Sequence, residues 1–298
     1  MPFHILSASV AFVTTIAALQ PASAQAAPQP SSDWSAVEQA LGRKGAMQPG
    51  AVIKFSFPRS DLQVTAAGVV LKPSFALGSW VAFRRSGSEA IAMGDLVLAE
   101  SEIAPVMQRL QAGGVEQTAL HNHVLGELPR IMYMHISAHG DAAKIAAAVH
   151  DALTLTGTPL GTPAPPAAAA AIELDTTAVA GALGTAGKVN GGVYQVSVAR
   201  AAKVMEHGME VPPSMGVATA INFQPTGGGK AAITGDFVIT ADEVNPVIRA
   251  LTSHGIAVTA VHSHMLHETP RLFFMHFWAN DDAVTLARGL RAALDAAR

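Results

Sequence analysis

The chain has 298 residues, of which 50% are hydrophobic and 14% are charged, and its formal net charge is -3. This composition supplies a large core and excludes an intrinsically disordered chain, while the length suggests two domains. The small net charge leaves no basic stripe, so the sequence predicts no nucleic-acid partner and no attraction to an anionic membrane surface. Because the chain has no cysteine, disulfides and thiolate metal sites are excluded, and any metal ligand must be His, Asp or Glu.

The amino-terminal segment has the features of an export signal. An apolar stretch at residues 5–19 is too short to cross a bilayer comfortably, and Ala22-Ser23-Ala24 behind it is a small-x-small cleavage signal. We interpret residues 1–24 as a secretory signal peptide, with an uncleaved anchor as the alternative, and residues 25–32 as a disordered leader. No later segment is a candidate membrane span, so we expect a periplasmic or secreted protein without a membrane span after signal cleavage.

The rest of the chain repeats itself at a shift of about 141 residues. HNHVLGELPRIMYMH, at residues 121–135, aligns without a gap with HSHMLHETPRLFFMH, at residues 262–276, and Gly94-Asp95 aligns with Gly235-Asp236. We therefore predict a first repeat domain at residues 33–155 and a second at residues 171–298. Residues 156–170 between them are rich in Pro, Gly, Thr and Ala, which is typical of a semi-extended linker.

The first half of each copy predicts a short helix followed by a half-buried strand. Asp33 is a suitable N-cap for a helix that places Trp34, Val37 and Leu41 on one face. Residues 53–57 then alternate apolar and polar side chains, as a strand with one buried face does. The second copy repeats this order, with a helix after Asp175 that carries Val179 and Leu183, and an alternating strand at residues 193–198.

The second half of each copy predicts the order strand, helix, strand, strand, helix. In the first copy these are a strand near residues 90–98, an amphipathic helix over 103–110, two strands that flank a turn at 125–129, and a helix that begins at Asp141. The second copy adds a capping box at Thr240 and Glu243. The predicted fold class is α+β, with two tandem copies of an antiparallel sheet backed by helices and related by a pseudo-two-fold axis.

The histidines are concentrated in the repeated motif. Residues two apart on a strand project to the same face roughly 6 to 7 Å apart, so His121 and His123 can direct two imidazoles at one point. If the antiparallel strand pairs His121 with about residue 135, His135 joins them, and Glu127 in the turn can complete the set. Residues 121–139 and 262–276 contain eight of the 12 histidines in the chain: His121, His123, His135, His139, His262, His264, His267 and His276.

We predict a metal site from this pattern, because three imidazoles and a carboxylate suit a divalent transition metal. Zn is favoured, and Mn, Fe, Ni and Cu accept similar ligands. The alternatives are that the histidines are structural, or that they bind a ligand without metal. The two copies can hold separate sites or share one. The predicted ligands are His121, His123, Glu127 and His135 in the first copy and His262, His264, Glu268 and His276 in the second.

Arg130 and Arg271 follow a proline in both copies, close to the cluster. As candidate catalytic residues they would orient a small anionic substrate. The alternative is that they pair with Glu127 and Glu268. His139 and His267 differ between the copies, and the aromatic residues Tyr133 and Phe274 are expected in the core.

The pattern ALHNHxLxExPRxxYMHxxxxGD, followed by an Ala-rich helix, resembles the LppY/LpqO-like family of bacterial exported proteins with a duplicated domain of unknown function. The resemblance covers both copies and implies an exported bacterial protein, here without a lipid-bearing cysteine. It implies no particular reaction.

The sequence thus favours an exported metal-binding protein. One form of this hypothesis is a metal-dependent hydrolase, with oxygen-dependent chemistry as the second choice, and another is metal storage or delivery. The alternatives are a metal-free binding module for a small anionic ligand and a structural envelope protein.

Overall fold

The computed structural model describes residues 1, 33–161 and 171–297. The predicted signal peptide and leader, apart from Met1, and residues 162–170 of the predicted linker lie outside these ranges. Residues 33–298 form one compact unit. Within the described ranges, none of the helices is both long and apolar enough to span a membrane.

The first repeat is a six-stranded antiparallel sheet with helices, as predicted. Its strand order is β1-β2-β5-β6-β8-β7. In chain order its elements are α1 (Ser35–Leu41), β1 (Ala46–Gln48), β2 (Val52–Pro58), β3 (Thr65–Ala66), β4 (Val69–Val70), α2 (Pro73–Ala76), β5 (Gly78–Ser86), β6 (Glu89–Ala99), the 3-10 turn η1 (Glu100–Glu102), α3 (Ile103–Ala112), β7 (Glu116–His121), β8 (Ile131–Gly140) and α4 (Ala142–Leu153).

The second repeat has the same architecture, with strand order β9-β10-β13-β14-β16-β15. The α+β prediction with two tandem antiparallel sheets is therefore confirmed. Its elements are α5 (Thr176–Leu183), β9 (Lys188–Asn190), β10 (Val193–Ala199), β11 (Val204–Glu206), β12 (Met209–Val211), the 3-10 turn η2 (Pro213–Met215), β13 (Ala218–Gly227), β14 (Lys230–Ile239), α6 (Ala241–Ser253), β15 (Ala257–His262), β16 (Phe273–Asp282) and α7 (Ala283–Ala296).

Local sequence signals explain where the helices begin. The Asp141 carboxylate accepts hydrogen bonds from the backbone N–H groups of Ala143 and Lys144, which the first turn of α4 leaves without intrahelical partners. Asp175 caps α5 in the same way, and Glu243 closes the capping box of α6 by accepting from the Thr240 backbone N–H.

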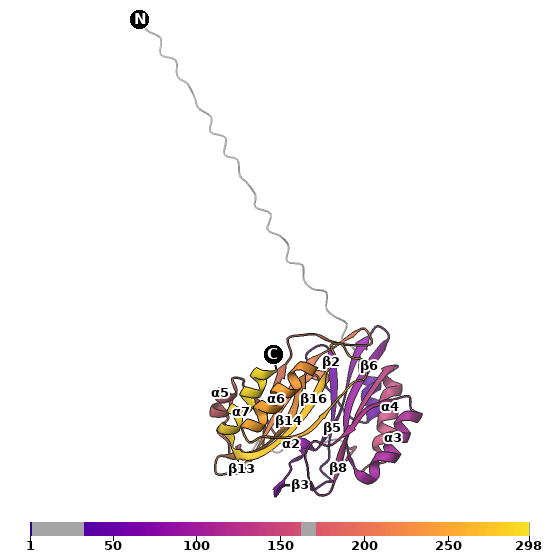
Figure 1. Cartoon of the computed structure of the whole chain (residues 1–298). Coiled ribbons are helices and arrows are strands. Elements are labelled where there is room, and N and C mark those ends of the chain that lie inside the picture. Colours follow the sequence, from indigo (N-terminus) through magenta and orange to yellow (C-terminus); the bar gives the residue numbers. More distant parts are fainter. Residues whose placement is uncertain (2–32, 162–170, 298) are drawn as a thin grey trace. The chain divides into compact units, whose positions relative to one another are not determined.

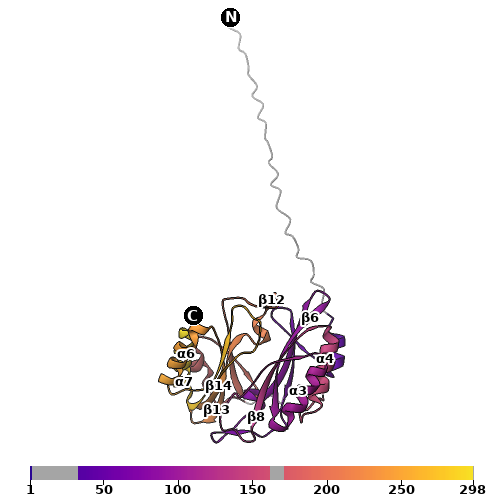
Figure 2. The same cartoon turned by 45° about the vertical axis from the view of Figure 1, so that its right-hand side comes forward.

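Each sheet has one face covered by the helices of its own repeat. In the first repeat, Ile53, Phe55 and Phe57 of β2 are buried in one core with Val37 and Leu41 of α1. The second repeat has the equivalent core beneath α5, α6 and α7. The helices α3 and α4 therefore lie on one side of the two sheets and α6 and α7 on the other (Figure 1), and a view turned by 45° shows the same arrangement (Figure 2).

The uncovered faces of the two sheets pack against each other. Ile91 and Met93 of β6 share a core with Val238 of β14 and Phe274 of β16. The result is a four-layer order of helices, sheet, sheet and helices, in which the space between the sheets belongs to both repeats.

Reciprocal contacts relate the two repeats by a pseudo-two-fold axis. The Thr118 hydroxyl donates to the His264 carbonyl at 2.6 Å, and the equivalent Thr259 hydroxyl donates to the His123 carbonyl at 2.6 Å. Such mutual pairing, in which equivalent groups exchange roles, is the signature of two-fold symmetry.

The start of the predicted linker differs from the expected extended segment. The Arg43 guanidinium donates to the Pro159 and Gly161 carbonyls, and the Gly157 backbone N–H donates to Glu102. Thr158 is buried, and Leu160 packs on the core of the first repeat. Residues 156–161 are thus part of the first domain, because these side chains satisfy their backbone groups.

Candidate metal centre

The hairpin that carries the histidines has a different register from the predicted one. His121 lies opposite Tyr133, and His135 lies opposite Ala119. The connection between β7 and β8 covers residues 122–130 and is longer than the predicted turn, and the pairing is displaced by two residues from the predicted one. His121 is the last residue of β7, and His123 follows the strand end.

A β-bulge in each hairpin directs a threonine toward the other repeat. The register shifts between Gln117 and Ala119 in the first copy and between Val258 and Ala260 in the second. The residues at these bulges are Thr118 and Thr259, the two donors that bridge the repeats. Bulges commonly redirect one side chain out of the regular ladder, and here they fix the two histidine hairpins to each other.

The six shared histidines meet at the interface of the repeats. His121 stacks on its equivalent His262 with ring centroids 3.6 Å apart. The other rings contact their partners across the interface, with His123 at 3.9 Å from His276 and His135 at 3.6 Å from His264. The structure therefore places both clusters in one common centre, one of the arrangements left open by the sequence.

The ligand atoms of three overlapping groups lie within 4.8 Å of one another in the described part of the chain. Two of these groups contain the same kind of triad. It consists of both histidines of one His-x-His pair and one histidine from the following strand of the other repeat, which is His276 or His135. The groups are His121, His123 and His276; His121, His135, His262 and His264; and Asp236, His262, His264 and His276.

The Nε2 atoms of all six histidines are buried without a protein hydrogen-bond partner among the described residues. The Nδ1 atoms of His121, His262 and His276 contact the carbonyls of Asn122, Ser263 and Gly235 at 3.1, 3.3 and 2.6 Å. Because a carbonyl only accepts, these contacts set the tautomer with the proton on Nδ1. In these three rings the Nε2 lone pair is then free for a metal.

Burial keeps these imidazoles neutral. It lowers the pKa of His121 and of His262 to about 4 and that of His276 to about 3, and it holds the pKa values of His123, His135 and His264 well below the usual range. A neutral imidazole is the form that binds metal, so a metal need not compete with protonation of these rings at neutral pH.

Two aspartates border the centre, and the sequence analysis did not assign them to it. Asp95 lies opposite His135 on the neighbouring strand, and Asp236 lies opposite His276. The carboxylate of Asp236 is 3.0 Å from His264 Nε2, and that of Asp95 is 3.8 Å from His123 Nε2. The Oδ1 atom of each aspartate is buried without a hydrogen-bond partner among the described residues, and each lies 4.0 Å from the strand histidine of its own repeat.

The two aspartates have raised pKa values. Burial, followed by the charge of Asp236, raises the pKa of Asp95 to about 7, and burial also raises the pKa of Asp236. A cation between these carboxylates and the imidazoles would offset the cost of the buried negative charge. In the sequence, these two aspartates could have been recognised by the Gly-Asp pair that recurs in an otherwise apolar strand of each copy.

The glycine of each pair allows the strands to approach closely. A Cβ at Gly94 would lie 2.7 Å from the Trp80 carbonyl oxygen, and a Cβ at Gly235 would collide with the Ala220 carbonyl. The Gly235 carbonyl also accepts the hydrogen bond from His276 Nδ1. Glycine at these positions therefore sets the place of the following aspartate and, in the second repeat, of one imidazole.

Tyr133 and Phe274 are buried, in agreement with their expected place in the core. Each ring also stacks on a histidine: Tyr133 on His123 at 3.3 Å, and Phe274 on His264 at 3.4 Å. By stacking, the two aromatic rings fix the orientation of the His123 and His264 imidazoles.

Glu127 and Glu268, predicted as ligands, lie outside the three groups of possible ligands. Glu268 instead accepts a hydrogen bond from the Leu272 backbone N–H at 2.9 Å and pairs with Arg271 at 3.3 Å. Glu127 accepts from the Ile131 backbone N–H at 3.5 Å. Both carboxylates therefore face the base of their own hairpin loops.

Arg130 and Arg271, the candidate catalytic residues, are exposed. Arg271 also donates to the Ser263 hydroxyl at 2.8 Å, next to His262 and His264. Arg130 lines a small pocket of about 130 Å³ together with Asn122, Val124 and Glu127. The pairing of Arg271 with Glu268 corresponds to the structural alternative from the sequence.

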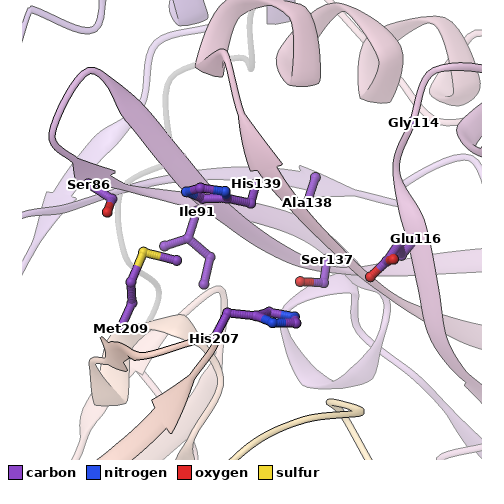
Figure 3. A pocket seen from close by; sticks show the side chains of 9 residues that line it. All are labelled: Ser86, Ile91, Gly114, Glu116, Ser137, Ala138, His139, His207 and Met209. Carbon is purple, nitrogen blue, oxygen red and sulfur yellow. The ribbon is translucent and has the colours of Figure 1, made fainter.

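A larger pocket of about 540 Å³ lies beside the centre, between β8 and the β11–β12 hairpin. Ser137, two residues after His135 on β8, lines it, and the imidazoles of His139 and His207 lie on different sides of it (Figure 3). His139 also lies 3.4 Å from Glu89, which places it at the sheet end and not among the six clustered histidines.

The fold and the histidine centre define a class of protein: a tandem duplication of an α+β domain, with its candidate site between the copies. The chain belongs to the family described as Domain of Unknown Function (DUF1259), which matches residues 35–155 and again residues 177–296. The two matches confirm the duplicated domain of unknown function.

Two solved structures align with most of the chain at low similarity. The trimeric bacterial microcompartment shell protein PduB is 15% identical, with 85% of this chain and 89% of that chain covered and a TM-score of 0.21. EtuB from Clostridium kluyveri is 11% identical over the same shares, with a TM-score of 0.19. Scores this low support no argument about function. The comparison with curated proteins finds no match.

Proposed function

We propose that the chain binds a divalent transition metal between its two repeats. The observation that carries the proposal is the convergence of six buried Nε2 atoms. None of them makes a hydrogen bond of normal geometry among the described residues, and the one carboxylate oxygen at such a distance, Asp236 Oδ2 at 3.0 Å from His264, is itself a possible metal ligand. Buried polar atoms are nearly always satisfied in folded proteins, and a metal ion would satisfy several of these at once. Six structural histidines would leave this accumulation unexplained.

The donor set indicates which ions fit. Neutral imidazoles with nearby carboxylates suit Zn first, and also Mn, Fe, Ni and Cu. The pseudo-two-fold axis makes the triad of His121, His123 and His276 equivalent to that of His262, His264 and His135. We therefore expect up to two ions per chain, each held by both repeats.

The metal-free alternative is less well supported. An anionic ligand in this centre would meet the carboxylates of Asp95 and Asp236, which are themselves buried and have raised pKa values. Neutral imidazoles supply no positive charge to compensate, so the electrostatics favour a cation.

Elemental analysis of the mature protein from its native compartment tests the proposal, in comparison with the double variant His121→Ala, His262→Ala. We expect one or two equivalents of a single transition metal in the natural protein and a loss from the variant. Absence of metal from the natural protein would refute the proposal.

We also propose export to the periplasm or beyond. The support is the apolar stretch at residues 5–19 with the small residues Ala22, Ser23 and Ala24 behind it, and the resemblance to LppY/LpqO-like proteins. Mass spectrometry of the amino terminus of the envelope fraction is the test. A chain that begins at or shortly after Gln25 is expected, and an intact Met1 in the cytosol would contradict export.

A hydrolase is the second candidate, and the free Oδ1 atoms of Asp95 and Asp236 favour it. A divalent ion at such a site supplies a water of lowered pKa. Asp95 or Asp236 would accept the proton, since each carboxylate adjoins a histidine triad. The test is turnover of a panel of p-nitrophenyl carboxylate and phosphate esters. Asp95→Asn, at a residue outside the three ligand groups, should retain metal and lose turnover; unchanged turnover would remove Asp95 from the reaction.

A further inference from the structure

The second repeat has a group of ionisable side chains outside the histidine centre, at the tip of the β11–β12 hairpin. Glu206 ends β11, and its side chain is only 2% exposed. Its Oε2 atom has no hydrogen-bond partner among the described residues. A buried carboxylate oxygen without a partner calls for a specific explanation.

The imidazole of His207 lies next to this carboxylate, and that of His267 lies beside His207. His207 Nε2 is 3.8 Å from Glu206 Oε1, and the ring of His207 is 5.0 Å from that of His267. Both histidines are exposed at the surface, so their rings can turn toward one ion. His207 also lines the larger pocket (Figure 3), which gives the group access to solvent.

Backbone hydrogen bonds hold the two segments that carry these side chains close together. Met205 and Thr269 exchange two hydrogen bonds, of 2.9 and 2.8 Å, which join the hairpin to the loop that carries His267. The positions of Glu206 and His267 are therefore fixed relative to each other by a bridge between their neighbours.

The first repeat provides an internal comparison. There Thr65 and Leu128 form the same bridge, with both hydrogen bonds at 2.9 Å. The turn that follows also has the same backbone, with φ of 46° at Ala67 and 49° at His207. The side chains nevertheless differ, since Ala66, Ala67 and Gly126 occupy the places of Glu206, His207 and His267.

The comparison shows that the backbone of this hairpin does not depend on the ionisable side chains. The turn and the bridge form in the first repeat without any of the three ionisable residues, so the scaffold does not need them. The neighbouring Glu268 does not neutralise Glu206 either, because it is an anion already engaged by Leu272 and Arg271. Burial and the charge of Glu268 both raise the pKa of Glu206, as they disfavour a second bare carboxylate there.

We propose that Glu206, His207 and His267 form a second cation site, which takes a divalent transition metal independently of the centre between the repeats. Two imidazoles and one carboxylate are a familiar ligand set for Zn²⁺, and they leave a fourth position for water. The site belongs to the second repeat and opens on the pocket, whereas the six-histidine centre is enclosed by both repeats.

Co²⁺ binding to the full chain, stripped of metal, tests this site. The key variant is His207→Ala with His267→Gly, which installs the residues of the first repeat and should therefore fold. We expect this variant to retain one equivalent of Co²⁺ fewer than the natural chain in equilibrium dialysis, and to lose the corresponding part of the visible absorption. The same loss is expected for Glu206→Gln.

The variant His121→Ala, His262→Ala separates this site from the central one. It should keep the equivalent bound at the hairpin even though the central ions are lost. If the His207→Ala, His267→Gly variant binds as much Co²⁺ as the natural chain, with the same affinity, the hairpin site is refuted whatever the state of the centre.

Discussion

His121 and His262 occupy equivalent positions in the two repeats, and their imidazoles stack face to face with centroids 3.6 Å apart and planes inclined by 20°. The pseudo-two-fold axis therefore passes between these two rings. Their Nε2 atoms are both buried and free of protein partners among the described residues. Two of the three possible ligand groups combine residues of both repeats, and the third, Asp236 with His262, His264 and His276, lies within the second repeat.

The first prediction concerns this sharing. His262→Ala should weaken metal binding at the whole centre, since His262 belongs to two of the overlapping ligand groups. Loss of a partner that only orients a ligand lowers metal affinity by about 10- to 100-fold, and loss of a ligand should cost at least as much. Competition with a chromophoric chelator measures the change.

His150→Ala is the matched control, because His150 lies on α4 outside the ligand groups, with its Nδ1 atom 3.8 Å from Asp151. It should leave the affinity unchanged. Full metal affinity in His262→Ala would contradict a role for His262 and would leave His121, His123 and His276 as the ligand group.

The second prediction is that Glu127 does not bind the metal. Glu127→Ala should retain metal, because the carboxylate accepts a hydrogen bond from the Ile131 backbone N–H and lies outside the ligand groups. The unfolding free energy should fall by about 1 to 3 kcal/mol, the usual cost of leaving a buried donor without its acceptor. Urea unfolding and metal analysis of the same preparation provide both values. Loss of metal with unchanged stability would restore Glu127 as a ligand.

The fold was predictable because its signals are local. The alternation of Ile53, Phe55 and Phe57 and the capping residues Asp141 and Asp175 act within a few neighbours, and each element appears where they place it. The histidines stood out for a similar reason, since their spacing recurs in both copies.

The composition of the centre was less predictable, because it depends on contacts between segments far apart in the chain. Nothing in the spacing of His123 indicates that its ring meets His276 of the other repeat. Asp95 was overlooked because a charged residue in an apolar strand gives no periodic signal. Glu268 has the spacing of a ligand, but the backbone of its own loop determines where its carboxylate points.

The third prediction concerns the bridge between the repeats. Thr118→Val and Thr259→Val each remove one hydroxyl that donates across the interface, with little change in shape. Each substitution should lower the unfolding free energy by about 1 kcal/mol. Metal affinity should fall as well, because the acceptors are the carbonyls of His264 and His123. Thr252→Val, whose hydroxyl bonds only within α6, is the control and should leave metal affinity unchanged.

The fourth prediction concerns Lys54, which lies between the sheets with its Nζ 3.8 Å from the centre of the Trp80 ring. Burial lowers the pKa of Lys54 to about 8, although the charge of Asp95 opposes this shift. The equivalent residue of the second repeat is the uncharged Gln195. Lys54→Gln should therefore stabilise the metal-stripped protein at neutral pH.

The sign of the pH dependence follows from the direction of this shift. Below about pH 8 the lysine is charged in both the folded and unfolded states, so folding bears the full cost of burying the charge. That cost is at most about 3.4 kcal/mol, for a shift of about 2.5 pKa units at 1.36 kcal/mol per unit, and it is reduced by the attraction to Trp80. As the pH rises from about 8 toward the unfolded value of 10.5, the folded protein loses the proton first and the natural chain regains stability.

Urea unfolding of both proteins in the presence of chelator, at pH 7 and at pH 10, measures the effect. The stability gained by Lys54→Gln should be larger at pH 7 and should shrink at pH 10. Lys44→Gln, at a side chain 88% exposed, should show no such trend beyond the small effect of its surface pair with Glu38. A gain that grows with pH would contradict the buried charge at Lys54, because deprotonation can only relieve that cost.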